Sequence, residues 1–176
     1  MIALIRPTTD LHAAWLVMVR EFHGAHIDGS GVMERSLEDL EGADAFAGWV
    51  AETTAHERGE RVPPELVAST LRWVIDDREP TTVIGTISLR HELNDYLRRV
   101  GGHIGYAVRP TARGRGVATA ALGLVQQECL DRGIDPVLIT CRDDNVASAR
   151  TIEHQGGALE EVEGGIRRSW ISLSQR

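Results

Sequence analysis

The sequence lacks a long hydrophobic run, so it contains no candidate for a membrane-spanning helix. No stretch approaches the roughly 18 apolar residues that such a helix requires. The first ten residues, MIALIRPTTD, are interrupted by Arg6, Pro7 and Asp10, which is unlike the apolar segment of a signal peptide. We therefore expect a cytoplasmic protein that has no membrane partner.

Cysteine is also scarce, which excludes a disulfide framework. Cys129 and Cys141 are the only two, and neither lies in a C-x-x-C pair of the kind that holds metals. We expect both to be reduced thiols. His23, His26 and Asp28 are spaced like metal ligands, but they straddle the end of a predicted helix and no second ligand pair follows. The sequence therefore predicts no metal.

The chain has no excess of positive charge. Its formal net charge is −7, whereas a nucleic-acid-binding surface needs a basic face. We therefore expect no nucleic-acid partner. The length of 176 residues, with 42% hydrophobic and 26% charged residues, is typical of one globular domain, which we place at residues 1–176.

Hydrophobic periodicity, glycine and proline predict an alternation of strands and helices. Strands are expected at residues 1–7, 67–77, 81–91, 103–109 and 135–141, and in a terminal hairpin that turns at Gly164–Gly165; helices are expected at 9–24, 33–56, about 114–132 and 145–157. Gly42 and Gly48 interrupt the second helical pattern, and residues 92–102 form a short helix or an irregular excursion. An antiparallel front half followed by one β–α–β crossover indicates an α+β fold around a mixed sheet.

The turn RPTARGRGVATA, at residues 109–120, has the features of an anion site. Pro110 ends strand pairing because it has no N–H, and Gly114 and Gly116 permit positive φ and a close approach of the backbone. The helix that follows presents unsatisfied N–H groups at the positive end of its dipole. With the charges of Arg113 and Arg115, this turn is suited to a phosphate and above all to a diphosphate.

Three known phosphate loops can be compared with this turn. The G-x-G-x-x-G form of dinucleotide-binding folds would need glycine where Thr119 stands, and Walker A needs a lysine, which the turn does not contain. A third form, R/Q-x-x-G-x-G/A after a strand, fits at each defined position from Arg113 to Ala118.

That third form resembles the coenzyme A (CoA) loop of the GCN5-related N-acetyltransferase (GNAT) family. Its context agrees, because the strand GHIGYAVRP precedes it, and an amphipathic helix, the strand VLITC and a helix opened by Asn145 follow. The resemblance covers roughly residues 2–173, and a bacterial subgroup also carries ISLRHELNDYL, GGHIGY, a late GG and IRRxWI. It implies a mixed, mostly antiparallel sheet with splayed central strands, and direct transfer of an acetyl group from acetyl-CoA to a primary amine in a ternary complex.

The resemblance also implies positions for the co-substrate. In the family, pantetheine lies between the splayed strands, here 103–109 and 137–141, and Val108 N–H becomes the donor to the thioester carbonyl. The diphosphate takes N–H groups of residues 113–118, and two residues of the next helix reach the pantetheine arm. The implied CoA-binding residues are Tyr106, Ala107, Val108, Arg113, Gly114, Arg115, Gly116, Val117, Ala118, Asn145 and Ser148.

The catalytic residues depart from the family pattern. A tyrosine acid often stands seven residues after the asparagine, where this chain has Ile152, and a glutamate base often stands at about Gly102. His103 is adjacent to Gly102, and a histidine pKa near 6.5 suits a general base. His91 and Glu92, at the end of the preceding strand, are the other candidates.

The acceptor is a small-molecule or peptide amine that the sequence does not identify. In the family, the region between the first two strands forms one wall of the acceptor site, so Asp28, Glu38 and Asp39 are candidates for attracting an ammonium group. The missing tyrosine and glutamate leave open a non-catalytic module that binds acyl-CoA. Arg90 and Arg142 leave open a longer donor such as succinyl-CoA. A homodimer through the terminal hairpin is also open.

Overall fold

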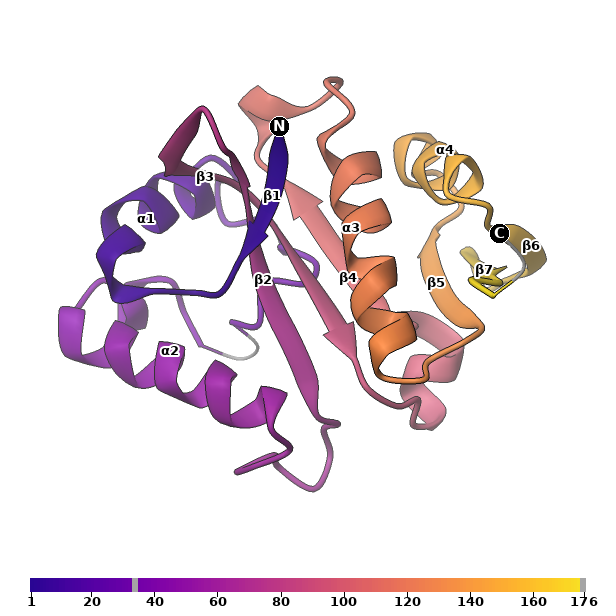
Figure 1. The fold of residues 1–176 in the computed structure, drawn as a ribbon, viewed down its shortest axis with the longest axis horizontal. Helices are drawn as coiled ribbons and strands as arrows, with labels where there is room; N and C mark the ends of the chain where they lie inside the picture. The colour runs from indigo at the N-terminus through magenta and orange to yellow at the C-terminus, as the bar shows by residue number, and fades with distance from the viewer. Residues whose placement is uncertain (33–34, 175–176) are drawn as a thin grey trace.

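The computed structural model describes residues 1–32 and 35–174, and these form one mixed sheet with the strand order β1-β2-β3-β4-β5-β7-β6 (Figure 1). The strands are β1 (Ile2–Ile5), β2 (Ser69–Asp76), β3 (Glu79–Arg90), β4 (Ile104–Val108), β5 (Val137–Arg142), β6 (Ala158–Glu163) and β7 (Ile166–Ile171). Every neighbouring pair is antiparallel except β4 and β5, which are parallel. The predicted α+β fold is confirmed.

Four α-helices cover this sheet within the described ranges. They are α1 (His12–Arg20), α2 (Ala43–Glu57), α3 (Val117–Asp131) and α4 (Val146–His154); shorter helical turns are η1 (Thr9–Leu11), η2 (Glu38–Leu40), the π-helical η3 (Leu97–Gly101) and η4 (Pro110–Ala112). None of the helices in the described part of the chain is long and apolar enough to cross a bilayer.

Two hydrophobic clusters fix the helices on the two faces of the sheet. On one face, α3 packs its buried side chains, Leu122 and Val125 among them, against strand residues such as Ile87 and Ile104. On the other face, Phe46 and Trp49 of α2 pack against Trp73 of β2, and Trp15 of α1 packs on both α2 rings. The bulge in the β2–β3 pairing near Val74 lets Val83 join the second cluster although Ile87 belongs to the first.

Most predicted elements exist, with two corrections of boundaries. The helix predicted from about Gly114 begins instead at Val117, because Pro110–Ala112 forms a 3₁₀ turn and an extended loop follows it. The pattern at 33–56 yields η2 and α2: Gly42 precedes the first residue of α2, whereas Gly48 lies within it without interrupting it. Residues 33–34 of that prediction lie outside the described residues.

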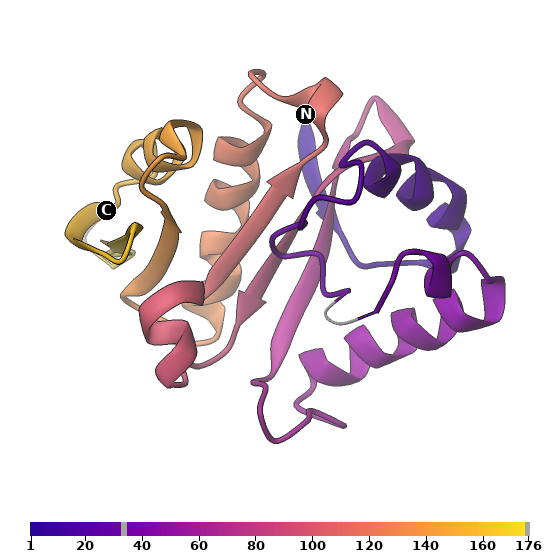
Figure 2. The same cartoon turned by 180° about the vertical axis from the view of Figure 1, so that it is seen from behind.

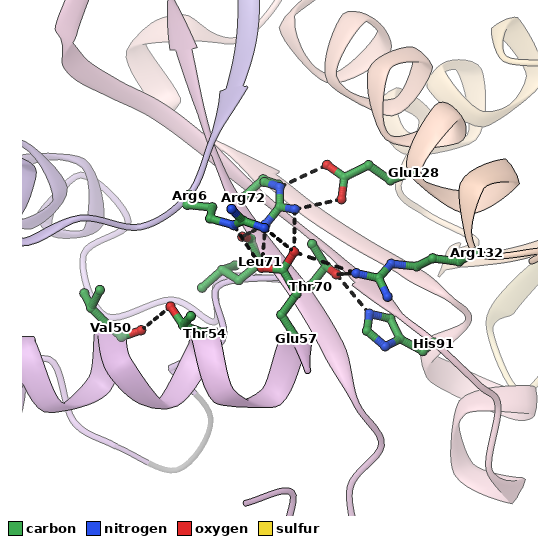
Figure 3. Close-up of polar contacts among 10 residues, drawn as sticks. All are labelled: Arg6, Val50, Thr54, Glu57, Thr70, Leu71, Arg72, His91, Glu128 and Arg132. Carbon is green, nitrogen blue, oxygen red and sulfur yellow. Dashed lines mark hydrogen bonds and ion pairs between the residues drawn. The ribbon is translucent and has the colours of Figure 1, made fainter. Parts of the chain in front are cut away.

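An arginine on β2 joins the two helix layers (Figure 3). β1 pairs only as far as Trp73, so Arg72 lies just beyond the end of the edge strand. Its guanidinium donates to Glu57 at the end of α2 (2.8 Å) and to Glu128 of α3 (2.9 Å), and both Arg72 and Glu57 are largely buried. The hydrogen bond from Arg72 is the main cause that lowers the pKa of Glu57 to about 2. This ionic network connects α2, β2 and α3.

Candidate active site

β4 and β5 separate soon after they meet. They share register only at Ile104 and Ile139, whereas β3 pairs with β4 from Ile104 to Val108 and β7 pairs with the whole of β5. Figure 2 shows the two strands diverging with α3 behind them. The sheet therefore contains a gap between two central strands, which is the splay expected from the family resemblance.

Alternation of hydrogen bonds along β4 decides which backbone groups face this gap. The backbone carbonyl of His103 accepts from the N–H of Arg90 in β3, and the backbone N–H of Arg109 donates to the carbonyl of Ile84 in β3. Because such bonds alternate along an antiparallel pair, Tyr106 and Val108 direct their N–H groups to the opposite side, toward β5. β5 is in register with β4 only at Ile104, so these two N–H groups lie on the side where the strands separate. Backbone donors of β4 therefore face the gap.

The turn after β4 presents a run of backbone donors. Gly114 and Gly116 have φ of 72° and 74°, which favours glycine, and a β-carbon at either position would meet nothing within 4 Å. The backbone N–H groups of residues 114–119 donate to no acceptor among the described residues. The N–H of Arg113, by contrast, donates to the carbonyl of Pro110 within the turn (3.3 Å). Arg115 is exposed and pairs with no described residue. This geometry fits a diphosphate.

Two sets of side-chain contacts, made by Glu21 and by Arg113, hold the turn in place. Glu21, just after α1, accepts hydrogen bonds from Arg109 (Nε, 2.8 Å) and from the hydroxyl of Thr111 (2.8 Å), and the Arg109 contact is the main cause that lowers the pKa of Glu21 to about 2. Arg113 turns back to donate to Val108 O (3.0 Å) and lies over the Phe22 ring. Arg113 therefore supports the loop from behind. No local sequence pattern identifies Glu21, because only the fold brings it to the turn.

Tyr106 crosses from β4 to α4. Its hydroxyl lies 2.7 Å from Ser148 Oγ, and burial raises the pKa of Tyr106 to about 12, so the phenol keeps its proton at neutral pH. The Asn145 side chain accepts from Ser148 N–H (3.1 Å) as the N-cap of α4. Ile152 is fully buried in the α3 cluster. Tyr106, Asn145 and Ser148 therefore come together beside the gap.

The three predicted proton acceptors lie in three different environments. His103 is buried, and its Nδ1 accepts from Leu138 N–H (2.9 Å); burial is the main cause that lowers its pKa to about 4. His91 contacts the Thr70 hydroxyl (2.9 Å) beside the Arg72 network (Figure 3), and burial lowers its pKa. Glu92 is exposed in the turn after β3. The structure does not bring these three side chains together.

A cavity of about 300 Å³ lies beside β4, on the face of the sheet that α1 and α2 cover. Its walls are the loop at 26–31, the end of α2, residues 65–67 and the segment 94–97, and Ser88 and Arg90 of β3 contribute to its floor. Asp28 lines it, as do His26 and His56, whereas Glu38, Asp39, His91, Glu92 and His103 do not. Arg142 is exposed and paired with Asp144, outside the cavity.

Gly29 joins the cavity to the gap. A β-carbon there would lie 2.1 Å from Gly105 O and 3.0 Å from Tyr106 N, so the loop can cross β4 this closely only as glycine. The carbonyl of Gly29 also accepts from the Thr86 hydroxyl (2.9 Å). Gly29, which lines the cavity, therefore lies next to the backbone N–H of Tyr106, which faces the gap. Among the described residues, no group of three or more His, Cys, Asp or Glu is placed to hold a metal ion.

Known proteins resemble this chain in sequence profile and in fold. The family described as "Acetyltransferase (GNAT) domain" matches residues 19–158. Mycobacterium smegmatis RimJ, solved in complex with CoA-disulfide, superposes with a TM-score of 0.71 at 18% identity, over 99% of this chain and 83% of that one. The microcin C7 self-immunity acetyltransferase MccE, in complex with acetyl-CoA and AMP, gives 0.65 at 16% identity, over 98% and 92%.

A third solved structure has the same fold. The ribosomal-protein-S5-alanine acetyltransferase from Vibrio fischeri gives a TM-score of 0.66 at 14% identity, over 97% of this chain and 91% of that one. No curated protein sequence matches the chain. At such low identities these structures support the fold, and the family follows from the sequence profile.

Proposed function

The chain belongs to the GNAT acetyltransferase family, and from this premise we propose that it is an N-acetyltransferase that moves an acetyl group from acetyl-CoA to a primary amine. The observation that carries the proposal is the gap between β4 and β5, which leads to a turn with six free N–H groups at residues 114–119. Solved relatives of the same fold hold CoA or acetyl-CoA. Attack by the amine is direct, within a ternary complex, and needs no enzyme nucleophile.

The described residues support binding of the diphosphate and the pantetheine arm of CoA. The N–H groups of 114–119 and the side chain of Arg115 would hold the diphosphate, with Arg113 supporting the loop from behind. The pantetheine arm would pair with the backbone groups of β4 that face the gap, beside Ala107 and within reach of Asn145 and Ser148. Bound there, acetyl-CoA supplies an activated acyl group with a thiolate leaving group.

The backbone of β4 would promote the chemistry by stabilising charge. The N–H of Val108 is our proposed donor to the thioester carbonyl, and that of Tyr106 is a second donor on the same side of the strand. A donor of this kind contributes about 3–4 kcal/mol in favourable cases. Ile152 supplies no acid, so either another group protonates the leaving thiolate or the thiolate departs without assistance.

Replacing Glu21 with glutamine is expected to raise the Kd for acetyl-CoA about tenfold. Glutamine keeps the shape but loses the charge that holds Arg109 and Thr111, and hydrogen bonds to charged groups are worth about 1.5–3 kcal/mol each. Calorimetric titration measures the change. Glu60→Gln is the matched control, because it breaks only the exposed pair with Arg58, and neither residue contacts the turn. Equal affinities of the two variants for acetyl-CoA would contradict a role for Glu21 in holding the turn.

His103→Gln is expected to change stability more than rate. A general base contributes about 10²–10⁴-fold to the rate, but the Nδ1 of His103 is already used and burial disfavours its charged form. Since its folded pKa of about 4 lies below the ordinary 6.5, stability is present above pH 6.5 and is lost as the pH falls toward 4. Acid unfolding of the variant should lack this component. A loss of kcat above about 100-fold would instead support His103 as the base.

Thiol release in the presence of amines tests the proposed function. Protein, acetyl-CoA and a panel of primary amines are incubated with a thiol reagent, and mass spectrometry identifies the acetylated amine. The chain contains no lysine, so acetylation of its own side-chain amines adds nothing to the signal, and reactions without acetyl-CoA correct for the reagent that Cys129 and Cys141 consume. We expect release that depends on one class of amine. Tight CoA binding without release for any amine would favour the non-catalytic module.

A further inference from the structure

Arg90 differs from the other largely buried arginines in having no carboxylate partner. Arg72 is neutralised by Glu57 and Glu128, and Arg109 by Glu21. Arg90 uses only Nη1, which donates to the carbonyls of Gly101 (2.8 Å) and Gly102 (3.3 Å). No acidic side chain among the described residues lies within ion-pair distance of it.

The guanidinium of Arg90 is held at the junction of the cavity and β4. A β-carbon at Gly105 would lie 3.2 Å from Nη2 and 3.3 Å from Nη1, so the end of the guanidinium contacts the strand one residue from Tyr106. Gly101, the last residue of the π-helical segment η3, and Gly102, which follows it, supply the two carbonyls that fix it. Arg90 also lines the cavity, and its Nε and Nη2 donate to no described residue. Two donors of the fork therefore remain for a ligand.

The cavity has a positive charge in its floor and negative charges among its exposed lining residues. Arg90 is the cation of the floor; burial lowers its pKa, and the charge of Asp28, which forms no ion pair with it, offsets this effect only in part. Asp28 and Glu65 are exposed carboxylates among the lining residues. A planar guanidinium binds a carboxylate through two parallel hydrogen bonds, whereas exposed carboxylates attract an ammonium group. The arrangement is complementary to a small molecule with both groups.

We propose that Arg90 binds a carboxylate of the acceptor, so that the substrate is a small amino acid or a related amino-carboxylate and not a polyamine. This inference rests on the proposed function, because it assigns the acceptor of the same reaction. The volume of about 300 Å³ is at the lower end for small-molecule sites and suits a compound of that size. A carboxylate on Arg90 would place an α-amino group close to the N–H of Tyr106, at the edge of the gap.

Matched acceptors test the proposal without any variant. Each L-amino acid is compared with its carboxamide, which keeps the amine and side chain but removes the carboxylate charge. We expect kcat/KM with acetyl-CoA to be at least about 30-fold higher for the preferred amino acid than for its carboxamide, as a charged hydrogen bond is lost. Equal rates for the two members of every pair would overturn the proposal while leaving the acetyltransferase function intact. No release with any amine would count against the proposed function itself.

Variants of Arg90 locate the effect. Arg90→Met should remove the preference for the carboxylate mainly through KM of the amino acid, and Arg90→Lys should restore only part of it, because lysine lacks the planar fork. KM for acetyl-CoA serves as the test of folding in both. A further experiment varies the acyl donor: it compares the rates with succinyl-CoA and with acetyl-CoA, using a carboxamide acceptor. An Arg90-dependent preference for succinyl-CoA would show that the carboxylate belongs to the donor, and would overturn the proposal.

Discussion

Replacing Gly116 with glutamate is expected to lower the affinity for acetyl-CoA at least about 100-fold, since two or more charged hydrogen bonds are lost. Gly116 precedes α3 with φ of 74°, and its N–H is one of six free donors in the turn. Glutamate adds a negative charge where we place the diphosphate and disfavours the positive φ that aims these donors. Calorimetric titration with acetyl-CoA and with CoA measures the loss.

Gly133→Glu is the matched control for this variant. Gly133 lies just after the other end of α3, with φ of 69° and with nothing within 4 Å of a β-carbon. Both substitutions carry the same backbone penalty of about 1–2 kcal/mol, and Gly133→Glu also places a negative charge at the negative end of the α3 dipole, so the control should lower the Tm at least as much as Gly116→Glu. Only Gly116→Glu should lose CoA. If Gly116→Glu bound CoA with wild-type affinity, the turn could not be part of the CoA site.

Replacing Arg72 with methionine is expected to destabilise the protein by about 3 kcal/mol, the lower end of the cost of breaking a buried pair. Methionine fills much of the volume, but Glu57 and Glu128 lose the guanidinium that both accept from. Arg6 and Arg132 still lie near Glu57, which limits the loss. For a chain of 176 residues this corresponds to a fall in Tm of about 6–12 °C.

The pH dependence and a control distinguish this network from a surface effect. Because the folded pKa of Glu57 is about 2 and its ordinary value is 4.5, its contribution is present above pH 4.5 and is lost as the pH falls toward 2. Arg72→Met should flatten that part of the stability profile. Arg58→Met, which breaks an exposed pair with Glu60, should leave stability nearly unchanged. Equal Tm values for the two variants would contradict the account.

The sequence predicted the elements and the turn because their signals are local. Pro110, Gly114 and Gly116 act through their own backbone, and Asn145 caps the helix that it precedes. The family resemblance added the splay of the central strands. Even there, packing moved one boundary: α3 begins at Val117 because the turn requires the residues before it.

The acceptor end of the site could not be predicted in the same way. The sequence singled out Arg90 only as a possible partner of a longer acyl donor, and its proposed contact with the acceptor depends on the carbonyl of Gly101 in η3 and on a loop that crosses β4 at Gly29. Glu21 likewise becomes important only when the fold places it against Arg109. Contacts between segments far apart in sequence carry no local pattern. The proton acceptor stays a prediction for the same reason.

Hydrogen exchange at individual amides tests the central claim most directly, because the claim concerns identified N–H groups. On addition of acetyl-CoA, exchange should slow at residues 114–119 and at Tyr106 and Val108. The hairpin turn at Gly164–Gly165 should exchange at an unchanged rate. Protection confined to other parts of the chain, or no protection at saturating acetyl-CoA, would contradict the placement of the co-substrate between β4 and β5.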